Sequence, residues 1–199
     1  MTRAGGWGVA ILMIAACLGG CANRVTPPDE LVSPVTVYVA DHGKHSSLLL
    51  PAAEPVPPGG PAYVQYAYGA WHCFALNNNG WRDYLRVALM TDRGALGREP
   101  IFESSRADLA RRLKARVTPL AVERADAEWL RIRLDAAFDA RAGEAIDNRL
   151  VTMMLVPYDG PNARYSLLNH CNHTTSRWLR QLGVRSPAWA TGSRFEAGD

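Results

Sequence analysis

Cysteine and histidine are the residues of this chain whose types and spacing could support covalent chemistry. Cys171 lies in the run from Asn169 to Gly183, where Trp178 and Leu182 recur at helical spacing and a glycine stands where a helix usually ends. Counting back along the apolar face places Cys171 in the first turn, facing inward. The positive end of the helix dipole favours the thiolate form of a cysteine at that position. The run therefore predicts a nucleophilic thiol at the start of a short helix.

A nucleophilic thiol needs a base that takes its proton and a group that orients the base. Of the five histidines, His170 and His173 are too close to Cys171 along the chain to be its partner. His45 stands at the start of a predicted strand, and we expect it to be the base. The alternative is that His45 is only a surface residue of a turn. The prediction requires Cys171 and His45 to face each other across the seam between helix and sheet.

The N-terminal segment predicts a bacterial lipoprotein signal, residues 1–20. A positive Arg3 is followed by a short apolar run, and Leu18-Gly19-Gly20-Cys21 reads as a lipobox whose cysteine is acylated and becomes the new N-terminus. Cys17 fits the pattern less well, and an uncleaved membrane anchor is the alternative. Ala22 after the cysteine, in place of Asp, indicates the outer membrane. We therefore expect a lipid-anchored protein, with a palmitoylated Cys21, that faces the periplasm.

This assignment leaves two of the four cysteines in the folded domain, Cys73 and Cys171. The periplasm is oxidising, so these two could form a disulfide. A domain with that disulfide would be a non-catalytic binding or structural lipoprotein of the envelope. If the two thiols are free, Cys171 remains available for chemistry.

Length and composition indicate one globular domain behind a linker. Residues 21–34 are polar and contain Pro27, Pro28 and Pro34, so we expect an extended linker there, followed by a domain over residues 35–199. The net charge is only +3, and acidic residues are interspersed among the basic ones, of which 20 of 22 are arginine. That balance does not indicate nucleic-acid binding. We expect a monomer without a cofactor.

The order of the predicted elements indicates an α+β fold with an antiparallel sheet packed against helices. Strands are expected at residues 35–40, 45–50, 62–75 and 117–122, the last at a sheet edge because of Pro119. Helices are expected at residues 81–90, 104–116 and 126–141, the second of them capped by Ser104 and Ser105. Residues 92–100 read as a glycine-containing loop, and residues 151–156 fit a helix or a strand equally well.

Two runs of the chain resemble a known family. The run from Val37 to Pro51, a strand, a Gly-x-His turn and a second strand that ends in proline, is similar to the first motif of an uncharacterised bacterial lipoprotein family named for the urease gene region. The run from Asn169 to Gly183 resembles its second motif, a Cys-Asn pair with threonine and a helix that ends in Leu-x-x-x-Gly. That family in turn resembles circularly permuted papain-like (NlpC/P60-like) proteins, in which the histidine strand precedes the cysteine helix.

The resemblance implies Cys171 as nucleophile, His45 as base and a hydrolase or acyltransferase activity on amide or ester bonds. By location, the substrate would be a peptidoglycan peptide or an acylated lipid or lipoprotein. The third strand of the family carries an acidic residue that is missing here, because the corresponding segment reads Ala67-Tyr68-Gly69-Ala70-Trp71-His72. His72 is the first candidate to orient His45, with Tyr68 and Gln65 as weaker ones. The backbone N–H of Cys171 and the side chain of Asn169 are the candidate oxyanion donors.

A metal site is the other chemical possibility. His170, Cys171 and His173 could join His45 or His72 as nitrogen and sulfur ligands. Their spacing fits no standard pattern, and the two histidines beside Cys171 could equally be polar residues at an exposed helix end. The interpretation that follows from the sequence is therefore a thiol site without metal.

Overall fold

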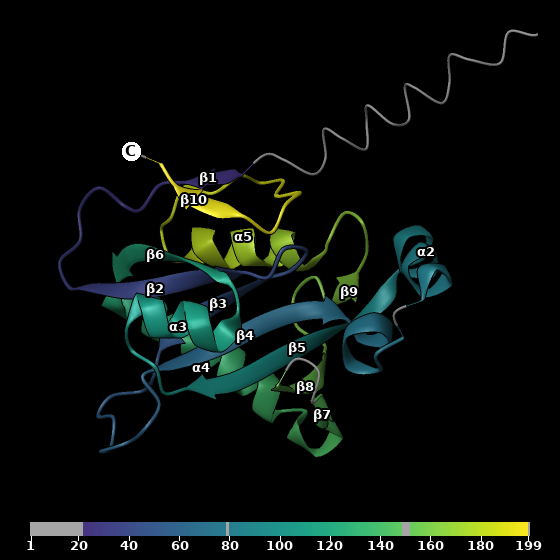
Figure 1. Ribbon diagram of the computed structural model, residues 1–199, viewed down its shortest axis with the longest axis horizontal. Coiled ribbons are helices and arrows are strands. Elements are labelled where there is room, and N and C mark those ends of the chain that lie inside the picture. Colours follow the sequence, from purple (N-terminus) through teal and green to yellow (C-terminus); the bar gives the residue numbers. More distant parts are fainter. Residues whose placement is uncertain (1–21, 79, 149–151, 199) are drawn as a thin grey trace, which may run out of the picture.

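The computed structural model describes residues 22–78, 80–148 and 152–198 (Figure 1). The predicted signal peptide and the lipobox Cys21 lie outside the described residues. Among the helices in the described part of the chain, none is long and apolar enough to cross a membrane.

An antiparallel sheet forms the body of the domain, with the order β6-β2-β3-β4-β5-β8-β7 (Figure 1). Its strands are β2 (Pro34–Asp41), β3 (Ser46–Pro51), β4 (Tyr63–Ala70), β5 (Asp92–Ile101), β6 (Arg116–Glu123), β7 (Ile146–Asn148) and β8 (Met153–Tyr158), and the short β9 (Arg164–Tyr165) pairs with the start of β5. The predicted α+β class and antiparallel sheet are confirmed, as is the edge position of the strand that carries Pro119.

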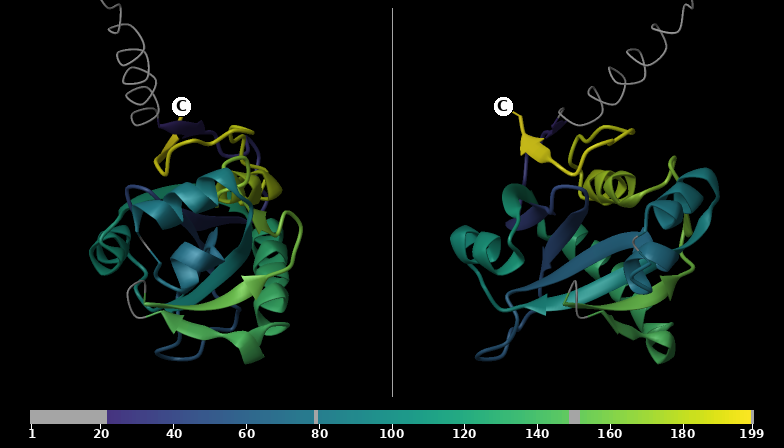
Figure 2. Two further views of the ribbon diagram at one scale, coloured as in Figure 1. Left: turned by 90° about the vertical axis from the view of Figure 1, so that its right-hand side faces the viewer. Right: turned by 45° about the vertical axis from the view of Figure 1, so that its right-hand side comes forward.

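Two helices pack on one face of this sheet, α4 (Arg124–Asp139) and α5 (Cys171–Gln181) (Figure 2). Side chains alternate between the faces of a strand, so Leu48, Leu50, Tyr66 and Tyr68 all point to this side. They form the main core with the buried residues of the two helices and of the neighbouring strands: Val37, Val39, Leu96, Val156, Leu130, Leu134, Phe138, Trp178, Leu179 and Leu182.

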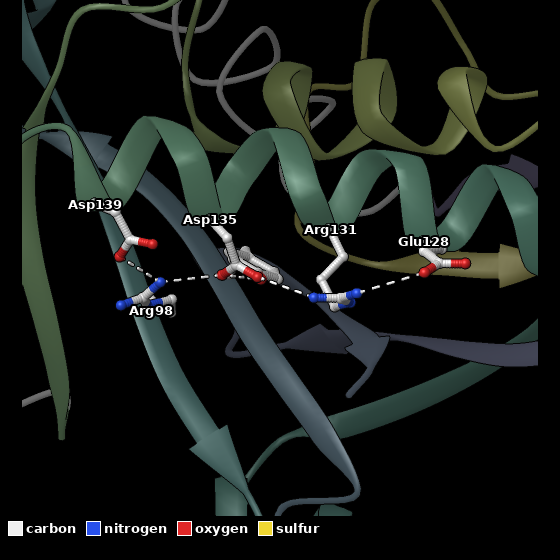
Figure 3. Close-up of polar contacts among 6 residues, drawn as sticks. Arg98, Glu128, Arg131, Asp135 and Asp139 are labelled. Carbon is white, nitrogen blue, oxygen red and sulfur yellow. Dashed lines mark hydrogen bonds and ion pairs between the residues drawn. The ribbon is translucent and has the colours of Figure 1, made fainter. Parts of the chain in front are cut away.

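A row of ion pairs fastens the outer side of α4 to the sheet (Figure 3). Arg98 of β5 lies 3.1 Å from a carboxylate oxygen of Asp135 and 2.9 Å from one of Asp139. The buried Tyr66 donates its hydroxyl hydrogen to Asp135 at 2.7 Å, and Arg131 reaches the same carboxylate at 3.2 Å. Arg98 and Arg131 therefore help to hold α4 on β4 and β5.

The opposite face of the sheet carries α3 (Arg106–Leu113) and a hollow beside it. Leu109 of α3 packs on Tyr38, Leu49 and Ile101. Ser105 is the N-cap as predicted, and its hydroxyl accepts the N–H of Asp108 at 3.1 Å. The helix ends at residue 113, earlier than predicted, because Lys114 takes a left-handed conformation with φ 49°.

The third predicted strand is shorter than expected. Strand β4 ends at Ala70, and residues Trp71–Ala75 form the π-helical turn η1 instead of continuing it, followed by α2 (Trp81–Leu89). Two contacts explain the turn: the N–H of His72 donates to Asp92 at 2.8 Å, and Phe74 folds back onto Gly69. A side chain at position 69 would collide with the Phe74 ring, so glycine is required by this close approach.

Two segments that the sequence left open or misassigned are strands. Residues 92–100 were predicted as a loop, which is wrong, because β5 covers this segment and pairs with both β4 and β8. Its glycines permit close neighbours and do not form turns: Gly94 lies under Tyr68, and Gly97 under Met153 and Leu155. The undecided apolar run near residue 153 is the strand β8.

The predicted linker is partly folded into the domain. Strand β1 (Asn23–Val25) pairs in parallel with β10 (Phe195–Ala197), and this small sheet lies over α5 (Figures 1 and 2). Val25 is fully buried, and the Asn23 amide donates to the carbonyl oxygens of Gly192 and Arg194. The expectation that the domain begins at residue 35 is therefore wrong, since the described fold already includes residue 23.

Candidate active site

Cys171 is the first residue of α5, as the helical spacing predicted. His170 is the N-cap, and its ring Nδ1 accepts the N–H of Asn172 at 3.3 Å. At the other end Gly183 has φ 74°, a left-handed conformation that suits the glycine after a helix. Only 6% of the Cys171 surface is exposed, so the thiol is held at the buried end of the helix.

The Cys171 thiol faces the turn between β2 and β3. Its Sγ lies 3.9 Å from the carbonyl oxygen of Lys44 and 3.5 Å from Oδ1 of Asn172. The Asn172 oxygen also accepts the hydroxyl of Ser46 at 2.9 Å, and Ser46 lies 3.0 Å from the hydroxyl of Thr175. This buried polar network joins the first turns of α5 to the first residue of β3.

His45 occupies the last position before β3, so its predicted place at a strand start is confirmed. The side chain is half-buried, and its ring centroid lies 5.1 Å from that of Phe74 and 6.0 Å from that of His42. The Nε2 atom is buried and has no hydrogen-bond partner among the described residues. An unpaired buried ring nitrogen is free to accept a proton from a substrate or a neighbouring thiol.

Cys171 and His45 line the same cavity, which has a volume of about 590 Å³. The cavity lies on the face of the sheet that carries α3, where Ala67 and Gly69 of β4 border it. Its wall is completed by apolar, polar and charged side chains from the surrounding strands, helices and turns: Ala70, Cys73, Phe74, Val87, Leu113, Met153, Tyr165, His42, Lys44, Gln65, Asn77, Glu99, Arg112, Lys114 and Thr152.

Cys73 and Cys171 are both free thiols. The disulfide that the sequence allowed is therefore not formed in the structure, although both thiols border the cavity. With its cysteines reduced, the site keeps a sulfur atom that can act as a nucleophile.

Burial determines the ionisation of the two candidate catalytic groups. It raises the pKa of the Cys171 thiol, although the backbone N–H groups of Asn172 and Ser46 and the hydroxyl of Tyr165 oppose this rise. The expectation that the helix dipole makes a thiolate is therefore wrong, because desolvation outweighs the helix terminus. Burial, with a smaller contribution from His42, lowers the pKa of His45 to about 3. At neutral pH the site holds a thiol and a neutral imidazole.

His72 does not orient His45, contrary to the prediction. Its Nε2 lies 2.8 Å from a carboxylate oxygen of Asp83, its Nδ1 lies 3.4 Å from the amide of Asn78, and its side chain does not border the cavity. The turn η1 carries this imidazole away from β4. Tyr68, a weaker candidate, points to the opposite face and donates to carbonyl oxygens near residue 162.

Asn169 is not placed as an oxyanion donor. Its amide nitrogen donates to the carbonyl oxygens of Asn162 and Arg164, both at 2.6 Å, and its oxygen accepts from Arg177 at 2.8 Å. These bonds hold the loop before α5, and the side chain does not border the cavity. The backbone N–H groups near the Cys171 sulfur remain the donors that could serve an oxyanion.

Gln65, the other weak candidate, lies in the cavity. Its amide nitrogen donates to the hydroxyl of Ser47 at 2.7 Å, and that hydroxyl lies 3.0 Å from Nε2 of His42. The Gln65 oxygen is buried and has no partner among the described residues. The sequence signal for this chain of contacts was the presence of two serines at the start of an otherwise apolar strand.

Asn172, Ser46 and Thr175 were missed as site residues. They position the thiol, but each looks ordinary in the sequence, because their contacts join segments more than 120 residues apart. Besides the two serines at the start of β3, the Cys-Asn pair at the helix start was the local signal for them.

The metal alternative is not supported. The rings of His170 and His173 stack with centroids 4.0 Å apart, so they pack against each other. The described residues contain no group of three or more histidine, cysteine or acidic side chains that could hold a metal ion.

Comparisons with protein-family models, with curated proteins and with solved structures found no match for this chain.

Proposed function

We propose that this protein is a thiol hydrolase or acyltransferase in which Cys171 attacks an acyl carbonyl and His45 accepts the thiol proton. The observation that carries the proposal is that Cys171 at a helix start and His45, whose buried Nε2 has no partner among the described residues, border one cavity. The two residues come from segments far apart in the chain. A nucleophile and a base brought together in this way are the parts that acyl transfer requires.

The reaction would proceed through an acyl-thioenzyme. The Cys171 sulfur forms a bond to the carbonyl carbon while the thiol proton moves to Nε2 of His45, and the tetrahedral oxyanion is held by the backbone N–H of Cys171. The leaving amine or alcohol takes the proton from His45 as its bond to carbon breaks. Water or an amine then attacks the thioester, with His45 as base again, and frees the thiol.

Because both groups are neutral at rest, proton transfer would accompany attack and would not precede it. The Cys171 thiol is close to Asn172 and to the carbonyl oxygen of Lys44, two acceptors that favour the protonated sulfur. A bound substrate would have to turn the thiol toward His45. Apo geometry of catalytic hydrogen bonds is often loose and tightens in the substrate complex.

Chain order and predicted location support a more specific form of the proposal. The histidine strand precedes the cysteine helix, and the helix packs on an antiparallel sheet, which is the arrangement expected of a circularly permuted papain-like domain. We propose that the chain belongs to the urease-region lipoprotein family and acts from the periplasmic side of the outer membrane. Its substrates would be peptidoglycan peptides or acylated lipids and lipoproteins.

Trapping tests the proposal directly. The whole chain in non-ionic detergent is incubated with envelope extract, digested with trypsin and searched by mass spectrometry for a hydroxylamine-sensitive mass on peptide 165–177, which carries Cys171 and no other cysteine. We expect an adduct in the wild type, none in Cys171→Ala and a strongly reduced amount in His45→Ala. The Cys73→Ser variant removes the other described thiol and should retain the adduct. Absence of an adduct, or equal modification of Cys73, would overturn the proposal.

A further inference from the structure

The only two lysines of the chain, Lys44 and Lys114, both border the cavity of Cys171. The other 20 basic residues are arginines, and of those that the structure describes only Arg112 borders this cavity. Lysine carries a compact charge on a flexible stem and can follow a mobile anionic group, whereas arginine favours fixed two-pronged pairs. Both lysines of the chain are therefore placed where they can bind an anionic group in this cavity.

The two lysines lie at the same end of the sheet, although 70 residues separate them in the chain. Lys44 is in the turn that joins β2 to β3, and Lys114 is in the connection from α3 to β6. Strands β2 and β6 pair with Asp41 opposite Arg116, two residues after Lys114. The register therefore brings both connections to one end of the sheet, where both lysines border the cavity.

In the described part of the chain, neither lysine has a partner for its charge. Their side chains form no ion pair and no hydrogen bond with any residue that the structure describes. Arg112, by contrast, is held by the buried Glu99. His42 and His45 add no positive charge at neutral pH, because burial lowers the pKa of both. Among the described residues, the charged groups that border the cavity are thus three cations and one anion, and the two cations without a described partner are the lysines.

The backbone conformation of Lys114 also indicates a binding role for this residue. This residue has φ 49° and ψ 41°, the left-handed conformation in which glycine is the favoured residue after a helix. A lysine there is strained, and strained residues of this kind gather at binding and active sites.

Resting on the function proposed above, we infer that the substrate carries an anionic group, a carboxylate or a phosphate, which Lys44 and Lys114 bind. The carbonyl oxygen of Lys44 lies 3.9 Å from the Cys171 sulfur, so one of the two cations belongs to a residue that contacts the nucleophile. Apolar side chains such as Phe74, Val87 and Met153 would receive the uncharged part of the substrate. The unpaired oxygen of Gln65 would accept a hydrogen bond from it.

Two small alkylating reagents test the electrostatic part without a substrate. Iodoacetate is anionic and iodoacetamide is neutral, and both transfer a two-carbon group to the Cys171 sulfur with loss of iodide. The ratio of their rates on peptide 165–177 of the whole chain in non-ionic detergent is compared with the same ratio for the chain unfolded in urea. We expect iodoacetate to be favoured in the folded protein by about three- to tenfold, and this preference to shrink in high salt.

The variants Lys44→Gln and Lys114→Gln should each lower the ratio, and the double variant should abolish the preference. Arg111→Gln is the matched control, because it removes one charge from α3 at a residue that does not border the cavity. The control should leave the ratio unchanged. An unchanged ratio in the double variant, or an equal fall in the control, would overturn the inference.

Protection of Cys171 identifies the anionic group. An acetylated dipeptide with a free C-terminal carboxylate is compared with its amide, and a short-chain phosphatidylglycerol with the matching phosphatidylcholine. If the peptide acid is the one compound that slows alkylation of Cys171, the anionic group is a carboxylate. If phosphatidylglycerol is the one compound that slows it, the group is a phosphate. If no anionic compound protects better than its partner, the substrate assignment is wrong. If the folded protein prefers iodoacetate but forms no acyl adduct at Cys171, the anion site is supported and the proposed activity is wrong.

Discussion

The sulfur of Cys171 lies 3.9 Å from the carbonyl oxygen of Lys44, the residue before His45. This contact joins the first residue of α5 to the turn between β2 and β3, across 127 positions of the chain. It depends on the register of β3 with its neighbours and on the depth at which α5 packs. The relative position of thiol and histidine turn is therefore a property of the whole sheet.

The first prediction concerns the ionisation of Cys171. Burial raises the pKa of this thiol, so the reactive thiolate is scarcer at pH 7 than the roughly 3% expected for a free cysteine of pKa about 8.5. We expect alkylation of peptide 165–177 by iodoacetamide to be slow at pH 7 and to keep rising beyond pH 9. Mass spectrometry at a series of pH values measures this profile.

The unfolded chain in urea provides the control for that profile, because its thiols should titrate at their ordinary pKa. A rate for folded Cys171 that levels off below pH 8 would show a preformed pair of thiolate and imidazolium. That result would contradict the neutral resting site and would restore the helix-dipole expectation.

The second prediction concerns stability in acid. Burial lowers the pKa of His45 to about 3 in the folded protein, while the unfolded side chain keeps a value of about 6.5. Between these two values the unfolded chain binds more protons, so stability falls as the pH falls through this window and is fully present above it. The loss due to His45 at pH 5 is at most about 2 kcal/mol. Urea unfolding at a series of pH values from 8 to 4 measures the slope of the free energy of unfolding against pH.

His45→Asn removes this titration and should flatten the slope. Part of it will remain, because burial also lowers the pKa of His170 to about 4. A His170→Asn variant should remove a separate part, and the two effects should add because the residues do not share a partner. An unchanged slope in His45→Asn would mean that His45 is accessible to protons in the folded state.

Local patterns predicted the elements that depend on neighbouring residues. The helix that begins at Cys171, its glycine end and the Ser105 cap all follow from contacts within a few positions, and the structure has them. The segment of β5 was misread because Gly94 and Gly97 usually indicate turns. In the structure they make room for Tyr68, Met153 and Leu155, which approach from other strands. No local pattern reveals that use of glycine.

The same distinction applies to the candidate site. Cys171 and His45 were recognisable because the types of neighbouring residues and the order of two motifs set them apart. The predicted roles of His72 and Asn169 were wrong because their side chains bind other groups. His72 pairs with Asp83, and Asn169 donates to the carbonyl oxygens of Asn162 and Arg164, in local folds that the sequence did not predict. The helix start at Cys171 was correctly predicted, but the burial that raises the pKa of its thiol depends on the packing of the whole domain.

The third prediction concerns Gly69 as a support for His45. A methyl group at this position would lie 2.5 Å from Cδ1 of Phe74, whose ring centroid is 5.1 Å from that of His45. Gly69→Ala should displace the ring and destabilise the protein by about 1–3 kcal/mol. It should also slow formation of the Cys171 adduct. Gly143→Ala is the matched control, since a methyl group there meets nothing within 4 Å. Equal stability of the two variants would show that Phe74 does not pack on β4.

The last prediction tests whether the segment after the lipobox belongs to the domain. Val25 is fully buried between β10 and the core, whereas Val32, in the same predicted linker, is 98% exposed. Val25→Ala removes two buried methyl groups and should lower the free energy of unfolding by about 2 kcal/mol, while Val32→Ala should change it by less than about 0.5 kcal/mol. Urea unfolding of the two variants, with an unchanged dependence on denaturant, measures the difference. If both variants matched the wild type, residues 23–25 would be a tether only, and the sheet over α5 would have to form without β1.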